Sequence, residues 1–288
     1  MKRILFFVVI ATATVSCDKV GKPYKIDKGG EVNIDTPAFP AVENVIQKYL
    51  FEDYTGHTCN NCPEGAAILR TLKSAMGDTL IPMAVHVGAT AKPISGTGSC
   101  AFSTDFRTPT GNAYADEFNI ENNPSCMINR RIFDGNRVLK GITAWETTVK
   151  SMSRPAPTMA IQIIPVHRND TTYIFIKTTL LSAVSSKLRL CAVLVESGIV
   201  APQKNSKSAL GSVPNICDYV HNHVLRTTIS PLWGENIELS QKDDTLIKAY
   251  SLLLAGTTWN KANCHIIAYI YDEDSKEILQ VEEAELME

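Results

Sequence analysis

Two cysteines separated by two asparagines, Cys59 and Cys62, constrain this chain more than any other feature. The apolar run 49–54 before them indicates a buried strand, and helical spacing of apolar residues after them predicts a helix that stops at Gly77. Cysteines three positions apart at a helix start can close a small disulfide loop. Unpaired N–H groups and the helix dipole favour a thiolate there, and a protonated His57 could add to this effect. The pattern predicts a redox-type motif, although a structural disulfide or two inert thiols is the alternative.

Further elements follow this motif up to residue 154. The sequence predicts a buried strand at 80–87, a helix near 112–118, a strand at 126–129, a hairpin turn at Asp134-Gly135 and a helix over 142–152. The stretch 88–111 is rich in Gly, Ser, Thr and Pro and reads as a surface insertion. This order of strands and helices is typical of an α/β domain, which we assign to residues 41–154.

The first 17 residues have the pattern of a lipoprotein signal peptide. Lys2 and Arg3 precede an apolar stretch over 4–13 that is too short to span a membrane. Ser16-Cys17 then fits a lipobox, in which lipidated Cys17 becomes the new N-terminus. Ordinary cleavage, with Cys17 free or in a disulfide, is the alternative. Residues 18–40 are polar with no periodicity and read as a flexible tether.

The pattern changes after the Pro155–Pro157 segment, which reads as a linker. Beyond it the apolar residues predict about eight short strands, at 159–167, 172–180, 188–196, 219–229, 236–240, 247–254, 264–271 and 277–281. Short strands with turn signals and no helical pattern indicate an antiparallel, immunoglobulin-like β-sandwich over residues 158–288.

Composition narrows the function classes. The chain has 288 residues, is 44% hydrophobic and has a formal charge of −2. It lacks the Lys/Arg-rich stripe that phosphate neutralisation requires, so we expect no nucleic-acid partner. We also expect no cofactor and no resident metal.

The remaining cysteines leave the pairing open. Export permits disulfides among Cys100, Cys126, Cys191, Cys217 and Cys264. Cys191 and Cys264 lie in apolar strands, where they read as core residues or as one inter-strand disulfide. Cys217 with His221 and His223 could form a zinc site, but a polar strand face beside a buried cysteine is the preferred interpretation.

The surroundings of the motif resemble thioredoxins. Asp53 lies six residues before Cys59, and Asn123-Pro124 immediately precedes the strand of Cys126. The resemblance implies that Asp53 relays a proton to Cys62 and that Pro124 is a cis-proline packed on the disulfide. It also implies that Cys59 attacks a partner disulfide and that Cys62 resolves the mixed disulfide. Thr58 and Asn60-Asn61 depart from the usual Trp and Gly-Pro.

A second resemblance covers nearly the whole chain after the signal peptide. Residues 51–63, 124–130 and 221–226 are similar to the Omp28-related outer-membrane lipoproteins of Bacteroidetes. This resemblance implies outer-membrane anchoring through lipid, without a known substrate. We expect thiol–disulfide exchange with exported or surface proteins. The alternative is a non-enzymatic surface lipoprotein, in which the first domain is a scaffold and the β-sandwich binds a protein or glycan.

Overall fold

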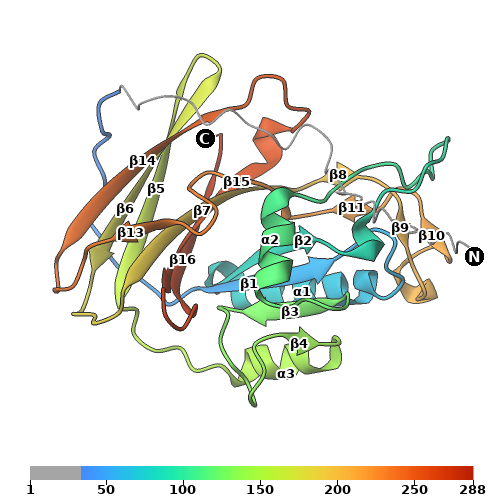
Figure 1. The fold of residues 1–288 in the computed structure, drawn as a ribbon, viewed down its shortest axis with the longest axis horizontal. Coiled ribbons are helices and arrows are strands. Elements are labelled where there is room, and N and C mark those ends of the chain that lie inside the picture. The colour runs from blue at the N-terminus through green and yellow to red at the C-terminus, as the bar shows by residue number, and fades with distance from the viewer. Residues whose placement is uncertain (1–33, 288) are drawn as a thin grey trace, which may run out of the picture.

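One nine-stranded mixed sheet runs through the fold. The computed structural model describes residues 34–287, so the expected signal peptide, Cys17 and most of the tether lie outside the described residues. The sheet consists of β1 (Tyr49–Thr55), β2 (Leu80–His86), β3 (Ser125–Ile128), β4 (Leu139–Lys140), β7 (Leu188–Glu196), β12 (Val224–Thr228), β13 (Glu235–Ile237), β15 (Cys264–Asp272) and β16 (Ile278–Glu285). Its order is β16-β15-β7-β12-β2-β1-β3-β4, with β13 paired to β7 (Figure 1).

Helices cover both faces of the sheet at β1. α1 (Cys62–Met76) joins β1 to its parallel neighbour β2, as the sequence predicts, and ends at Gly77, whose φ of 55° favours glycine. Alternate residues of β1 point to opposite faces. Phe51 packs in one core cluster with α1 and with Trp145 of α3 (Thr143–Ser151). Tyr54 packs in another with Tyr114 of α2 (Pro109–Glu117).

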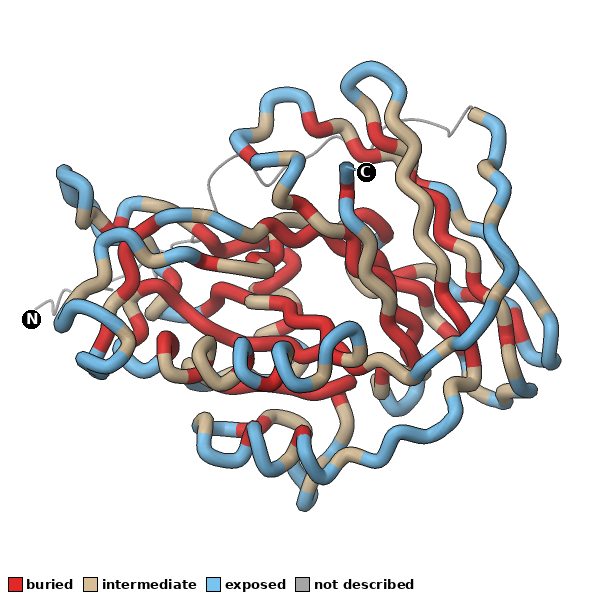
Figure 2. The backbone as a smooth tube through the Cα atoms, turned by 180° about the vertical axis from the view of Figure 1, so that it is seen from behind, coloured by how far each residue is buried: buried red, intermediate tan, exposed pale blue. Residues whose placement is uncertain are grey.

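The C-terminal half adds a second, three-stranded antiparallel sheet in the order β14-β6-β5. Its strands are β5 (Met159–Arg168), β6 (Thr171–Leu180) and β14 (Thr245–Leu253). Ile174 and Ile176 of β6 pack in one cluster with Leu190 of β7 and Ile266 of β15, so the two sheets share a core. The fold is therefore β-rich with several sheets, and buried backbone concentrates in its middle (Figure 2). The immunoglobulin-like topology stays a prediction.

The large sheet continues across the expected domain boundary. β12 pairs in parallel with β2 at Val224 and Ala84, and the Ala84 N–H donates to the carbonyl of His223 at 2.8 Å. The side-chain amide of Gln280 donates to the carbonyls of Ile46 and Met159, which lie on either side of the linker. The two halves therefore share a sheet and part of a core. The Pro155–Pro157 linker by itself predicts that residues 18–154 fold alone, and this stays a prediction.

The predicted strand at 219–229 is interrupted in the structure. Residues 220–221 form β11 (Val220–His221), while β12 begins only at Val224. Between them His223 has a φ of 55°, and its N–H donates to the Ser197 hydroxyl at 3.0 Å. β11 instead pairs with β8 (Ile199–Val200), and β9 (Gln203–Lys204) pairs with β10 (Asn215–Ile216). Residues 197–223 thus leave the large sheet as an excursion, which we call the cover segment.

Candidate functional site

Cys59 and Cys62 form a disulfide at the start of α1. Asn61 occupies the N-cap position, Cys62 is the first helical residue, and Pro63 falls in the first turn, where its missing N–H costs little. The side chains of Cys59 and Cys62 are only 5% and 2% exposed. Cys59, which the thioredoxin resemblance makes the attacking cysteine, is therefore not exposed in the oxidised chain, because other parts of the chain lie over the motif.

The cover segment makes several hydrogen bonds to the backbone around the disulfide. The Gln203 side-chain amide donates to the carbonyl of Cys59 at 3.0 Å. The N–H groups of Lys204 and Ser206 donate to the carbonyls of His57 and Asn60 at 2.8 and 3.1 Å. These contacts satisfy backbone acceptors of the motif with groups almost 150 residues away in sequence, so they hold the cover segment against the disulfide.

The insertion after β2 covers the motif from another direction. The Thr58 N–H donates to the carbonyl of Thr90 at 2.9 Å. A Cβ on Gly56 would lie 2.5 Å from backbone atoms of Thr90, so only glycine permits this approach. Phe102 stacks on the ring of His57 with centroids 5.8 Å apart. Burial lowers the pKa of His57, so the structure does not support the protonated His57 that the sequence suggested.

A second disulfide joins these two covering parts. Cys100 of the insertion is bonded to Cys217 of the cover segment, across 117 residues of sequence. Cys217 is exposed and Cys100 is half-buried. Within the described part of the chain the other three cysteines, Cys126, Cys191 and Cys264, are free and buried, so the suggested Cys191–Cys264 bond is absent.

Asp53 lies beneath the helix on β1. Its side chain is 3% exposed, and its Oδ1 has no hydrogen-bond partner in the described part of the chain. Burial raises the pKa of the Asp53 carboxyl to about 7. β3 places Cys126 directly opposite Asp53, where burial also raises the pKa of the thiol. A carboxyl poised near neutrality can accept or release a proton at physiological pH.

Pro124 follows a cis peptide bond, as the thioredoxin resemblance implies. The side-chain amide of Asn123 lies 2.8–2.9 Å from the carbonyls of Thr55 and Val87 and from the hydroxyl of Thr90. Asn123 therefore ties the end of β1, the end of β2 and the insertion together next to the motif.

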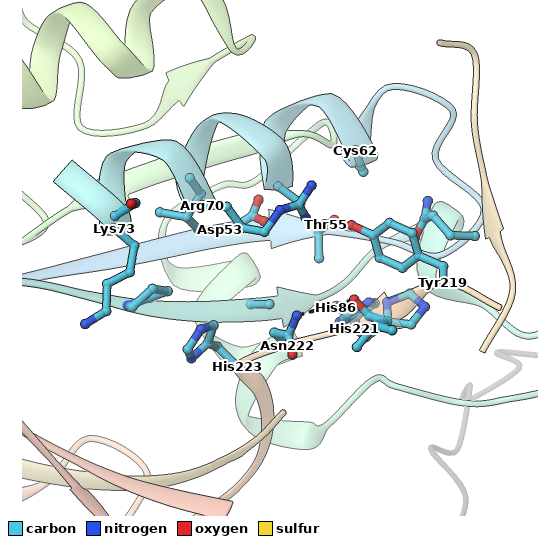
Figure 3. A pocket seen from close by; sticks show the side chains of 17 residues that line it. Asp53, Thr55, Cys62, Arg70, Lys73, His86, Tyr219, His221, Asn222 and His223 are labelled. Carbon is cyan, nitrogen blue, oxygen red and sulfur yellow. Dashed lines mark hydrogen bonds between the residues drawn. The ribbon is translucent and has the colours of Figure 1, made fainter. Parts of the chain in front are cut away.

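A cavity of about 370 Å³ lies between α1 and the central strands on one side and the cover segment on the other. Cys62, Asp53, Arg70 and Lys73 line it from α1 and β1, while His86 and His221 line it from β2 and β11 (Figure 3). The cavity therefore brings Cys62 and Asp53, both predicted site residues, to one space. Cys59 and Pro124 are not among the residues that line it.

Histidines gather at the inner end of this cavity. The rings of His86 and His221 have centroids 5.6 Å apart, and both pack on Phe106. Burial lowers the pKa of His86 well below its usual range and that of His221 to about 4, so both rings are neutral at physiological pH. Among residues 34–287 no group of three His, Cys, Asp or Glu side chains is placed to hold a metal ion. Cys217, one member of the alternative zinc set, is instead disulfide-bonded.

Comparison with protein families identifies the chain. The model of the outer membrane protein Omp28 family matches residues 111–288, which is more than half of the sequence. The chain belongs to the Omp28 family. The match begins after the Cys59–Cys62 motif, so the motif itself lies outside the matched residues. No curated protein matches this Omp28-family chain.

Solved structures resemble the Omp28-family fold at low sequence identity. HBP35 of Porphyromonas gingivalis has a TM-score of 0.57 at 11% identity, covering 84% of this chain and 76% of its own. A domain of the outer membrane lipoprotein Omp28 from Porphyromonas gingivalis has a TM-score of 0.31 at 18% identity, covering 46% of this chain and 90% of its own. Protein AGR_C_4864 from Agrobacterium tumefaciens has a TM-score of 0.49 at 12% identity, covering 85% of this chain and 97% of its own. The first of these shows a shared fold.

Sequence reasoning missed the covering parts of the site in this Omp28-family protein. Gln203 gave no signal, because a lone glutamine in a polar stretch has no motif. The Cys100–Cys217 bond could be suspected only from export and the presence of leftover cysteines. His221 was noted as a possible metal ligand, whereas it lines a cavity with His86, which the sequence analysis did not single out. No helix within residues 34–287 is long and apolar enough to cross a membrane.

Proposed function

We propose that this Omp28-family protein exchanges disulfides with exported or surface proteins through Cys59 and Cys62 of a thioredoxin-like unit. One observation carries the proposal: Cys62 of a formed disulfide lines the same cavity as Asp53, a buried carboxyl with an unpartnered oxygen. The parallel β1–α1–β2 unit and the disulfide at the helix start support the thioredoxin-like assignment.

The exchange proceeds in two steps from the reduced protein. The Cys59 thiolate attacks a partner disulfide, forms a mixed disulfide and releases one partner thiolate. Cys62 then loses its proton to Asp53 and attacks the Cys59 sulfur, which restores the Cys59–Cys62 bond and releases the second partner thiolate. Asp53 suits this role because its carboxyl has a pKa of about 7 and is ionised in part of the molecules at neutral pH. Pro124 lies in the loop that would face the bound partner strand.

A second function has an observation in its favour. Both cysteines are nearly fully buried, and hydrogen bonds from Gln203 and Ser206 hold the cover over the motif. A permanently closed cover would make the disulfide structural. The protein would then be a non-enzymatic surface lipoprotein that binds a protein or glycan through its β-rich half.

Trapping in cells separates the two functions. Cys62→Ser removes the resolving thiol, so mixed disulfides between Cys59 and exported proteins should accumulate. Cys59→Ser is the matched control and should give none. Asp53→Asn should slow resolution without abolishing the first attack, because an amide cannot accept the proton. If neither cysteine of the reduced chain can be alkylated below denaturing conditions, the scaffold function is correct.

We also propose that a lipid on Cys17 anchors the protein to the outer membrane. The family match supports the outer-membrane location, and the short apolar segment ending at Ser16-Cys17 supports the anchor. Cys17→Ala should shift the protein from the membrane fraction to the soluble fraction. Retention of the variant with the outer membrane would contradict the anchor.

A further inference from the structure

The cavity beside Cys62 contains polar groups that no residue within 34–287 satisfies. Asp53 Oδ1, both ring nitrogens of His86 and Nε2 of His221 are buried, and the described residues offer them no hydrogen-bond partner. All three side chains line the cavity and are at most 4% exposed. Each buried group left unpaired costs about 1–3 kcal/mol, so a molecule that bonds these atoms would be bound favourably.

The size of the cavity fits a small molecule. Its volume of about 370 Å³ exceeds by roughly tenfold the ~30 Å³ that one water occupies, and it lies at the lower end of the range for small-ligand pockets. Ala66, Leu69, Pro82 and Ala84 form apolar walls along its length. A ligand with a short apolar chain and polar ends would match these walls and the unpaired groups together.

Two positively charged side chains line the cavity. Arg70 and Lys73 line it from one side of α1, and Figure 3 shows Lys73 at the opposite end from Cys62 and His221. Arg70 is exposed and its positive charge lies close enough to the Tyr219 hydroxyl to favour the ionised phenol, and Lys73 is half-buried. Asp53 is the one acidic residue among those that line the cavity. Glu283 lies near Lys73 outside the lining, and burial raises the pKa of its carboxyl, which weakens its competition for Lys73.

We propose that the cavity binds a low-molecular-weight thiol carrying a carboxylate, with its sulfur at Cys62 and its carboxylate at Arg70, while Lys73 adds positive charge at the far end of the cavity. This inference rests on the proposed exchange function and names the small-molecule partner of the same disulfide. Protein partners react at Cys59 beneath the cover segment, whereas the small thiol reaches Cys62 from the cavity.

The reaction at Cys62 balances with two equivalents of the small thiol. One thiolate attacks Cys62 Sγ, so the Cys59–Cys62 bond breaks and Cys59 leaves as a thiolate near the N-terminus of α1. A second thiolate attacks the ligand sulfur of the mixed disulfide and expels Cys62 as a thiolate. Asp53 in its protonated form gives Cys62 a proton, and Cys59 takes one from solvent. Two small thiols are oxidised to their disulfide, and the protein disulfide is reduced.

Two thiols of the same length test the ligand class on the purified full chain. 3-Mercaptopropionate carries a carboxylate, and 3-mercaptopropionamide is its neutral analogue. Initial rates of reduction, normalised to thiolate concentration, are followed by alkylation and mass spectrometry. The carboxylate thiol should reduce Cys59–Cys62 about tenfold faster, because charge pairing in a partly enclosed site is stronger than in water. The exposed Cys100–Cys217 bond in the same sample is an internal control and should show no such preference.

Variants locate the binding site. Arg70→Gln with Lys73→Gln should remove the preference, while Lys242→Gln, an exposed charge on the β13–β14 turn, should leave it unchanged. Ala66→Leu, which fills the cavity, should slow both thiols at Cys59–Cys62. In Cys59→Ser, the disulfide of 3-mercaptopropionate should give an adduct that peptide mapping places on Cys62.

Different outcomes overturn this inference and the exchange function. Equal rates for the two thiols, or a preference that survives loss of Arg70 and Lys73, would refute the ligand class. If that result comes with mixed disulfides between Cys59 and exported proteins, the exchange function stands without it. Binding is tested separately with unreactive 3-(methylthio)propionate, which should raise the melting temperature of the parent chain and not that of Ala66→Leu. A rise in melting temperature without any reduction of the Cys59–Cys62 disulfide by the thiols would contradict the exchange function but support the binding site.

Discussion

Glu52 and Arg130 form an ion pair in which both side chains are 0% exposed, with Arg130 Nη2 2.9 Å from Glu52 Oε1. Four aromatic rings surround the guanidinium, with centroids 4.9–5.8 Å away: Tyr114, Phe118, Tyr269 and Tyr271. The Tyr269 hydroxyl accepts a further hydrogen bond from Arg130 at 3.2 Å. Glu52 lies on β1, the strand that also carries Asp53, and Tyr269 lies on β15. The hydrogen bond from Arg130 to Tyr269 therefore connects this pair to the second half of the chain.

We expect Glu52→Gln to destabilise the protein by about 3–5 kcal/mol, because it leaves the Arg130 charge buried without its counter-ion. Glu52→Leu with Arg130→Met should recover much of this loss. The partly exposed pair Arg131–Glu277 is the matched control, and Glu277→Gln should cost less than about 1 kcal/mol. Urea unfolding monitored by fluorescence measures each change. A small effect of Glu52→Gln would show that Arg130 finds other compensation in the aromatic cage.

Breaking the Cys100–Cys217 bond should expose the first disulfide. In Cys100→Ser with Cys217→Ser, the insertion and the cover segment are no longer tied together. We expect reduction of Cys59–Cys62 by dithiothreitol to accelerate on the order of tenfold, which corresponds to about 1.4 kcal/mol of lost local stability. Alkylation of buried Cys191 is the control for global unfolding and should not change. If the rate of reduction is unchanged, hydrogen bonds such as that from Gln203 to Cys59 are sufficient to hold the cover segment over the motif without the second disulfide.

Stability should depend on pH through Asp53. Its carboxyl has a pKa of about 7 in the folded chain, against 3.8 ordinarily, so the folded chain binds more protons between these pH values. The free energy of unfolding should therefore fall as pH rises from about 4 to 7. Asp53→Asn removes this loss and should be the more stable protein at pH 8, by roughly 4 kcal/mol. Denaturant unfolding of both proteins at pH 5 and pH 8 measures the difference. If the difference in the free energy of unfolding between the two proteins does not increase from pH 5 to pH 8, ionisation of Asp53 does not destabilise the folded chain.

A fragment of residues 18–154 tests whether a domain boundary lies near Pro155. The Pro-rich linker by itself predicts that this fragment folds alone. The structure leads us to expect the opposite, because the fragment loses the β12 partner of β2 and the Tyr269 contact of Arg130. Calorimetry and light scattering should show aggregation or a broad transition, whereas the chain from residue 18 to 288 should melt cooperatively. A soluble fragment with a sharp thermal unfolding transition would contradict this expectation and support a domain boundary near Pro155.

Local sequence patterns determined the elements around the motif. The apolar run before Cys59, helical spacing after Cys62 and Gly77 as a stop place β1 and α1 within a residue or two of the structure. The cis bond before Pro124 followed from the thioredoxin resemblance rather than from propensity. These features are encoded within a few residues, because periodicity and helix caps depend on neighbours in the chain.

Only the tertiary structure decided what surrounds the disulfide. Gln203 reaches Cys59 across 144 residues, and Cys217 reaches Cys100 across 117. The interruption at His223 looks like ordinary strand sequence, yet it sends the cover segment over the motif and lets β12 join β2. Burial of Asp53 and Cys59 follows from these long-range contacts. Contacts of this kind depend on which segments the topology brings together, and the residues that make them carry no local pattern from which a partner could be chosen.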